Sequence, residues 1–140
     1  MIFELRFARD MTEQEMITRT KKFALRIMKL VGALPKTVQG NAISNQLMRS
    51  GTSVAANYRA ACRARSKQEF IAKLGTVEEE ADESAFWLEL IVEGQLLSEN
   101  IVTPLLKESG ELVAIVAASK KTATSRLFRS QIVNRKSQIS

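Results

Sequence analysis

Residues 66–94 read SKQEFIAKLGTVEEEADESAFWLELIVEG, and they carry the clearest amphipathic pattern in the chain. Ser66 and Glu69 form a capping box, a pair in which each side chain can accept a hydrogen bond from a free backbone N–H at the start of a helix. Apolar or small residues then recur every three or four positions, at Phe70, Leu74, Val77, Ala81, Ser84, Leu88 and Ile91. Because this spacing places them on one side of a helix and Gly94 is typical of a helix end, we predict a long helix from Ser66 to Gly94.

The sequence before this helix contains two further helical patterns. Thr12 and Glu15 form a second capping box, which together with a closing glycine and proline predicts a helix from Thr12 to about Ala33. Another helix is expected between about residues 37 and 65. Its inner face lacks bulk, so that a neighbouring helix backbone can approach closely. The small residues of this segment are Ser50, Gly51, Ser53, Ala55, Ala56, Ala60 and Ala61.

A fourth helix and two terminal segments complete the chain. Thr103 followed by Pro104 is typical of an N-cap with proline at the first helical position, and the apolar pattern continues to about Phe128. Residues 131–140 are mostly polar and basic, so we expect a mobile basic tail. In residues 1–11 apolar and charged side chains alternate, which favours a short extended arm that docks on its own bundle or on another subunit.

Four amphipathic helices joined by short connections predict an all-α fold, an antiparallel up-down-up-down four-helix bundle over residues 12–130. A content of 45% hydrophobic and 26% charged residues with two prolines and six glycines is typical of one ordered domain. The single cysteine, Cys62, cannot form an internal disulfide, and the charged residues near the N-terminus are unlike a signal peptide. No stretch approaches the roughly 20 apolar residues of a membrane span. We therefore expect a cytoplasmic protein that does not cross a membrane.

The composition argues against catalysis. With no histidine and one cysteine, the chain lacks the usual nucleophile–base pairs and the usual ligands of transition metals. One acidic cluster resembles the carboxylates of di-iron bundles, but those sites also need Glu-x-x-His motifs, which are absent. The cluster consists of Glu78, Glu79, Glu80, Asp82 and Glu83. We interpret it as a solvated face and expect no enzymatic activity, no metal and no cofactor.

Arg49 is the basic residue that the helical pattern places opposite this acidic cluster. It lies on a flank of the second predicted helix, and we expect it to pair with Glu80 or Glu83, either inside the bundle or across a subunit boundary. The alternative is an exposed ion pair that contributes little to stability. If the pair is buried, Arg49→Ala should be much more destabilising than Arg19→Ala, because a buried charge that loses its partner is costly.

The same region contains an ordered series of residues that is known from one protein family. The series consists of Gln46, Leu47, Arg49, Ser50, Ser53, Asn57, Arg63, Ser66, Glu69 and Phe70. It resembles bacterial four-helix-bundle proteins related to those encoded in intervening sequences of large-subunit ribosomal RNA genes. The chain departs from that family at Ala60-Ala61, where Glu-Gly is common, and at Glu79-Glu80, where a small Gly-Ser pair is usual.

This resemblance implies an antiparallel four-helix protomer with no known enzymatic activity, often assembled as a ring-shaped homopentamer. Distantly similar proteins are accessory factors of diversity-generating retroelements, in which a basic pentamer is thought to engage RNA and a reverse transcriptase. The resemblance thus implies self-association as a homo-oligomer and, by analogy, RNA or DNA and a protein such as a reverse transcriptase as partners.

The charge distribution independently favours a nucleic-acid partner. The net charge is +6, and no acidic residue follows Glu111. In an up-down-up-down bundle the ends of the second and fourth helices lie at the same pole, which would gather a set of basic residues there. This basic pole consists of Arg59, Arg63, Arg65, Lys67, Lys120, Lys121, Arg126 and Arg129. Such clustering is typical of phosphate binding, although it also fits a surface that neutralises the acidic helix of a neighbour.

Two hypotheses follow from the sequence. In the first, the protein is a non-enzymatic, self-assembling accessory factor that binds RNA or DNA through its basic pole. In the second, it is a homo-oligomeric scaffold that binds protein partners without nucleic acid. A pentamer is the assembly that we expect first, because the resemblance points to it.

Overall fold

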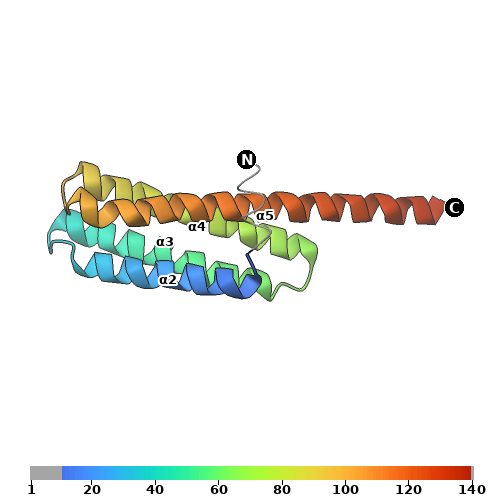
Figure 1. Ribbon diagram of the computed structural model, residues 1–140, viewed down its shortest axis with the longest axis horizontal. Helices are drawn as coiled ribbons and strands as arrows, with labels where there is room; N and C mark the ends of the chain where they lie inside the picture. The colour runs from blue at the N-terminus through green and yellow to red at the C-terminus, as the bar shows by residue number, and fades with distance from the viewer. Residues whose placement is uncertain (1–10, 140) are drawn as a thin grey trace.

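The structure, a computed structural model, describes residues 11–139, which form four α-helices. They are α2 (Glu13–Gly32), α3 (Val38–Cys62), α4 (Lys67–Glu93) and α5 (Glu99–Ile139). Figure 1 shows α2 and α4 running in one direction and α3 and α5 in the opposite direction. Each helix packs against the next one, and α5 also contacts α2, so the predicted all-α four-helix bundle is confirmed. Residues 1–10, which make up most of the predicted arm, lie outside the described residues.

All four helices contribute to one core. The buried side chains recur at helical spacing, as the sequence pattern predicts, and many of them are completely inaccessible to solvent. The largest of these are Phe23 and Ile27 from α2, Leu47 from α3, Leu74, Leu88 and Ile91 from α4, and Leu112 from α5. Full burial of each such side chain stabilises the fold by about 1.5–3 kcal/mol. Packing of these side chains therefore fixes which side of each helix faces the core and which side faces solvent.

The helix starts are set by local hydrogen bonds. The capping box of α2 is confirmed, because Thr12 and Glu15 each accept a backbone N–H of the other at 3.1 Å. At α4 only half of the predicted box forms. Ser66 accepts the backbone N–H of Glu69 at 3.1 Å, whereas the Glu69 carboxylate accepts the N–H of Arg65 rather than that of Ser66.

The small residues of α3 allow a close approach to α2, as predicted. Gly51 is buried, and a Cβ atom there would lie 2.8 Å from a side-chain carbon of Ile27. On another side of α3, the hydroxyl oxygens of Ser50 and Ser84 lie 2.9 Å apart. Both serines are completely buried, so this hydrogen bond joins α3 to α4 inside the bundle.

The predicted start of α5 is wrong. The helix begins at Glu99, so Pro104 lies inside it and Thr103 is not its N-cap. The Thr103 hydroxyl instead donates to the backbone carbonyl of Glu99 at 2.7 Å. The reason is packing, because Val102 is completely buried beside Leu105 in the core and this burial extends the helix upstream of the proline.

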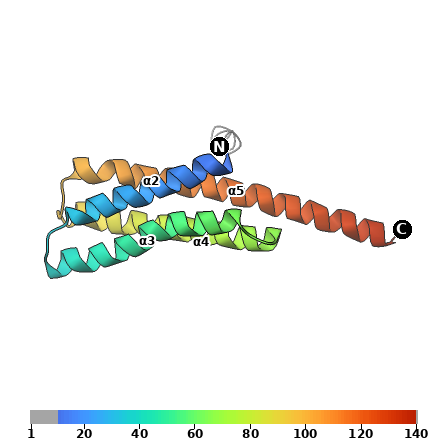
Figure 2. The same ribbon diagram turned by 90° about the horizontal axis from the view of Figure 1, so that it is seen from below.

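The predicted end of α5, near Phe128, is also wrong. The helix continues to Ile139, and neither proline nor glycine occurs after Gly110 to interrupt it. Its final turns extend beyond the other three helices (Figures 1 and 2), and every residue from 131 to 139 is exposed. The expected basic tail is therefore helical over these residues, and its mobility stays a prediction.

Candidate nucleic-acid interface

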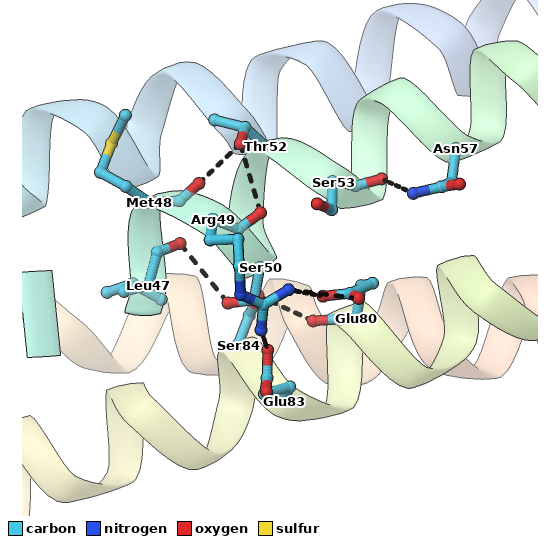
Figure 3. A network of polar contacts seen from close by, with 10 residues as sticks. All are labelled: Leu47, Met48, Arg49, Ser50, Thr52, Ser53, Asn57, Glu80, Glu83 and Ser84. Carbon is cyan, nitrogen blue, oxygen red and sulfur yellow. Dashed lines mark hydrogen bonds and ion pairs between the residues drawn. The ribbon is translucent and has the colours of Figure 1, made fainter. Parts of the chain in front are cut away.

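Arg49 reaches across from α3 to two carboxylates of α4 (Figure 3). Its Nη1 lies 3.1 Å from Oε2 of Glu80, and its Nη2 donates to Glu83. The structure thus brings these three residues together within one protomer. The Arg49 side chain is 48% exposed. Of the two alternatives, a buried and an exposed ion pair, this is the exposed one. An ion pair with this exposure positions the two helices but contributes little to their stability.

A more buried ion pair, between Arg19 of α2 and Glu108 of α5, is not indicated by the sequence pattern. Arg19 donates to both carboxylate oxygens of Glu108, at 2.8 and 2.7 Å, and also to Glu111 at 2.7 Å. The side chains of Arg19 and Glu108 are only 20% and 15% exposed. Burial alone would raise the pKa of Glu108, but the hydrogen bonds and charge of Arg19 outweigh this effect and lower it.

This geometry reverses the expected order of the two arginines. From the sequence, Arg19 is expected to be the less important arginine, but it makes a bidentate contact with Glu108. This contact is more buried than the contacts of Arg49. No local signal could have revealed the pair, since its partners are 89 residues apart in the sequence. We therefore expect Arg19, rather than Arg49, to be the more important arginine for stability.

The acidic cluster of α4 is divided between several surroundings. Glu78 pairs with Lys120 of α5 at 2.7 Å, and Glu80 and Glu83 pair with Arg49. Glu79 and Asp82 are exposed on the outer side of α4. Among residues 11–139, no three acidic or cysteine side chains lie close enough together to hold a metal ion.

The predicted basic pole is assembled from three parts of the bundle. Arg59 lies in the last turn of α3 and Arg63 is the C-cap of that helix. Arg65 and Lys67 lie at the turn into α4, and the other four residues belong to α5. Among residues 11–139, only Lys120 of this set is engaged in an ion pair, the one with Glu78. The remaining residues are exposed. They are Arg59, Arg63, Arg65, Lys67, Lys121, Arg126 and Arg129.

A groove of about 650 Å³ between α2 and α3 adjoins this pole. Thr52, Ala55 and Ala56 provide small side chains along it, while Arg59 and Arg63 line it from α3. The other basic residue of the groove is Lys21 of α2, which the sequence pattern does not indicate because its basic neighbours in the groove come from a different helix. A second hollow, of about 410 Å³, lies at the turn from α3 to α4 and is lined by Arg65 and Lys67 among others.

Cys62 lines both hollows, but its chemistry is not that of an activated nucleophile. Burial raises the pKa of its thiol, so that the protonated form is favoured at neutral pH. No helix in the described part of the chain is long and apolar enough to cross a bilayer. Both hollows are lined by basic side chains, Arg59 and Arg63 at the first and Arg65 and Lys67 at the second.

Comparisons with known proteins agree with this architecture. A family model for the 23S rRNA-intervening sequence protein matches residues 12–118. A crystal structure of a protein of unknown function from the S23 ribosomal protein family of Bacteroides thetaiotaomicron is 30% identical, with a TM-score of 0.72. The similarity covers 79% of this chain and 99% of that one. No curated protein matches the sequence. The chain therefore belongs to the 23S rRNA-intervening sequence protein family.

Proposed function

We propose that this protein is a non-enzymatic, self-assembling accessory factor that binds nucleic acid through the basic pole. The observation that supports the proposal most is that seven of the eight predicted cations are exposed and without an ion pair among residues 11–139. Free arginine and lysine side chains of this kind bind phosphates and release condensed counterions, which is the main source of affinity for nucleic acids. A surface that only neutralised its own acidic residues would have its cations paired.

The groove between α2 and α3 is the part of this surface best suited to a nucleic-acid backbone. Its small side chains at Ala55 and Ala56 leave room for a strand, and Lys21 from α2 and Arg59 and Arg63 from α3 line it with positive charge. Tyr58, an aromatic residue nearby in the sequence, is buried and cannot stack on a base. Binding should therefore depend on phosphates and discriminate poorly between sequences.

RNA is the first nucleic acid to test, because the family is named for proteins of 23S rRNA intervening sequences. The proposed site of action is the cytoplasm, and the proposed assembly is a homo-oligomer, with a pentamer as the first choice. A reverse transcriptase or another protein bound to the same RNA is a further proposed partner by analogy.

The second candidate function is a homo-oligomeric scaffold that binds proteins without nucleic acid. It is favoured by the exposed apolar side chains outside the basic pole, which include Leu25 and Met28 on α2 and Phe86 on α4. Apolar side chains on a helical surface are typical of protein contacts. In this case the free cations would serve solubility only.

The two functions are separated by measuring the affinity for a fluorescently labelled single-stranded RNA by anisotropy at several salt concentrations. Arg59→Ala/Arg63→Ala should bind more weakly than wild type, and its slope of log affinity against log salt should be smaller in magnitude by about 1.4, for two lost phosphate contacts on a single strand. The matched control is Lys29→Ala/Lys36→Ala, which removes two exposed charges outside the basic pole. Absence of wild-type binding at low salt, or the same slope for both variants, would refute the proposal and favour the scaffold.

A further inference from the structure

The end of α5 carries an apolar stripe that no other part of residues 11–139 covers. Phe128, Ile132 and Ile139 are 62%, 38% and 86% exposed, and their spacing of four and seven residues places them on the same side of the helix together with Arg135. We call residues 128–139 the overhang. It lies beyond the bundle (Figures 1 and 2) and beyond residue 118, where the match to the family ends. Exposed apolar side chains in a regular row are typical of a surface that docks on a partner.

The charge of this helix end determines what it can dock on. From residue 112 to the C-terminus the chain has basic residues and no acidic ones. Two overhangs lying side by side would therefore place like charges against each other, which is destabilising. The complementary surface must be acidic and must also offer an apolar contact.

The outer side of α4 has both properties. Glu79, Asp82, Phe86, Glu89 and Glu93 are spaced by three or four residues, so they form one exposed row opposite the buried face of the helix. We call this row the acidic face. Its four carboxylates make no ion pair within the described part of the chain. Phe86 is 50% exposed at the middle of the row, where its ring meets Trp87 edge-on at a centroid distance of 5.0 Å.

The overhang cannot reach the acidic face of its own protomer. The ion pair between Glu78 and Lys120 sets the register of the antiparallel helices α4 and α5. From that point the acidic face extends toward the start of α5, whereas the overhang extends in the opposite direction (Figure 1). Contact between them therefore requires two copies of the protein.

We propose that the overhang of one copy docks on the acidic face of a second copy. Phe128 and Ile132 cover the exposed ring of Phe86, and Arg135 lies among the carboxylates of the row. Each copy then provides one overhang and one acidic face, a head-to-tail contact that repeats from copy to copy and closes a ring where the rotation permits. The contact residues Phe128, Ile132 and Arg135 do not belong to the basic pole, although Arg129 of the pole lies between them in the sequence, so the contact can be tested separately from nucleic-acid binding.

Charge exchange tests the contact directly. Arg135→Glu/Lys136→Glu makes the overhang acidic, and Glu79→Lys/Asp82→Lys makes the opposite face basic; all four residues are exposed and outside the core. Each variant alone should associate about ten- to a hundred-fold more weakly than wild type in sedimentation equilibrium, because two attractive pairs become repulsive. An equimolar mixture should associate more tightly than either variant alone, since the overhang of each variant then finds a face of opposite charge on the other. In a ring of five copies one contact between like variants remains, so recovery to the full wild-type affinity is expected only for assemblies with an even number of copies.

Cross-linking identifies the two surfaces. In a Cys62→Ser background, Phe86→Cys/Ile132→Cys should form disulfides between copies on mild oxidation, and peptide mass mapping should find position 86 joined to position 132. Phe86→Cys alone and Ile132→Cys alone serve as controls and should remain uncrosslinked at the same concentration. Circular dichroism of every variant checks that the helices are retained.

Several results would overturn the proposal. Wild-type mass for either charge variant alone, or no recovery in the mixture, would show that the overhang does not hold copies together. Loss of RNA affinity in Arg135→Glu/Lys136→Glu with unchanged self-association would assign the overhang to nucleic acid instead. The RNA measurements change Arg59 and Arg63, whereas the charge variants change Arg135, Lys136, Glu79 and Asp82. Failure of the RNA measurements would therefore refute nucleic-acid binding without refuting the contact between copies.

Discussion

Arg19→Ala should lower the free energy of unfolding by about 2 kcal/mol, a value between those of exposed and buried ion pairs. Exposed pairs contribute about 0–1 kcal/mol, whereas removing one partner of a fully buried pair costs about 3–5 kcal/mol. The Arg19 and Glu108 side chains retain 20% and 15% of their exposure, so Glu108 left alone would recover part of its hydration but not all of it. The loss of two hydrogen bonds to Glu108 and one to Glu111 adds to this cost.

The measurement is thermal and urea denaturation followed by circular dichroism at one fixed protein concentration, because association between copies also changes apparent stability. For a chain of this size, 2 kcal/mol corresponds to a fall in Tm of about 7 °C. Arg49→Ala is the matched control, since it also removes an arginine that contacts two glutamates but is 48% exposed, and its Tm should change much less. The double variant Arg19→Ala/Glu108→Ala completes a thermodynamic cycle and should be less destabilised than the sum of its single changes.

This prediction reverses the order that the sequence alone suggested for the two arginines. A Tm for Arg19→Ala equal to or above that of Arg49→Ala would refute it. Such a result would mean that the ion pair between Arg19 and Glu108 contributes no more to stability than an exposed ion pair.

Three further predictions concern the helices and their charges. Gly51→Ala should lower the free energy of unfolding by about 1 kcal/mol despite the better helix propensity of alanine, because the added methyl meets Ile27 at 2.8 Å. Gly75→Ala, with no atom within 4 Å of its Cβ, should raise the free energy of unfolding by about 0.5–1 kcal/mol. Changes of the same sign for both variants in urea denaturation would contradict this prediction. Pro104→Ala should raise the free energy of unfolding by about 1–2 kcal/mol, because proline has no N–H to donate to the helical hydrogen-bond pattern. An unchanged urea midpoint would show that the missing hydrogen bond does not destabilise α5. The pKa of Glu108 is lower in the folded protein, so its ion pair stabilises the fold fully at pH values above the ordinary carboxyl pKa of about 4.3. This contribution is lost as the pH falls through the pKa of the folded state. If the wild type remained more stable than Glu108→Gln in strong acid, the assignment would be contradicted.

The helices could be predicted largely because their signals are local. The capping box of Thr12 and Glu15 and the apolar rows of α2 and α4 depend on residues three or four positions apart, which meet in any helix regardless of the remainder of the chain. The closeness of Arg49 to Glu80 and Glu83 could also be anticipated, since α3 and α4 are consecutive and antiparallel. Sequence alone therefore determined the fold class, three helix starts and one cross-helix ion pair.

The tertiary structure decided what depends on register between distant helices or on burial. Local signals at Thr103 and Pro104 indicated a later start for α5, but the core position of Val102 extends the helix upstream of them. Arg19 and Glu108 meet, and Lys21 joins Arg59 along one groove, because α2 packs against both α3 and α5, and no spacing within a segment encodes these contacts. Exposure of the ion pairs likewise follows from the packing around them, which is why the more buried arginine is Arg19 and not Arg49.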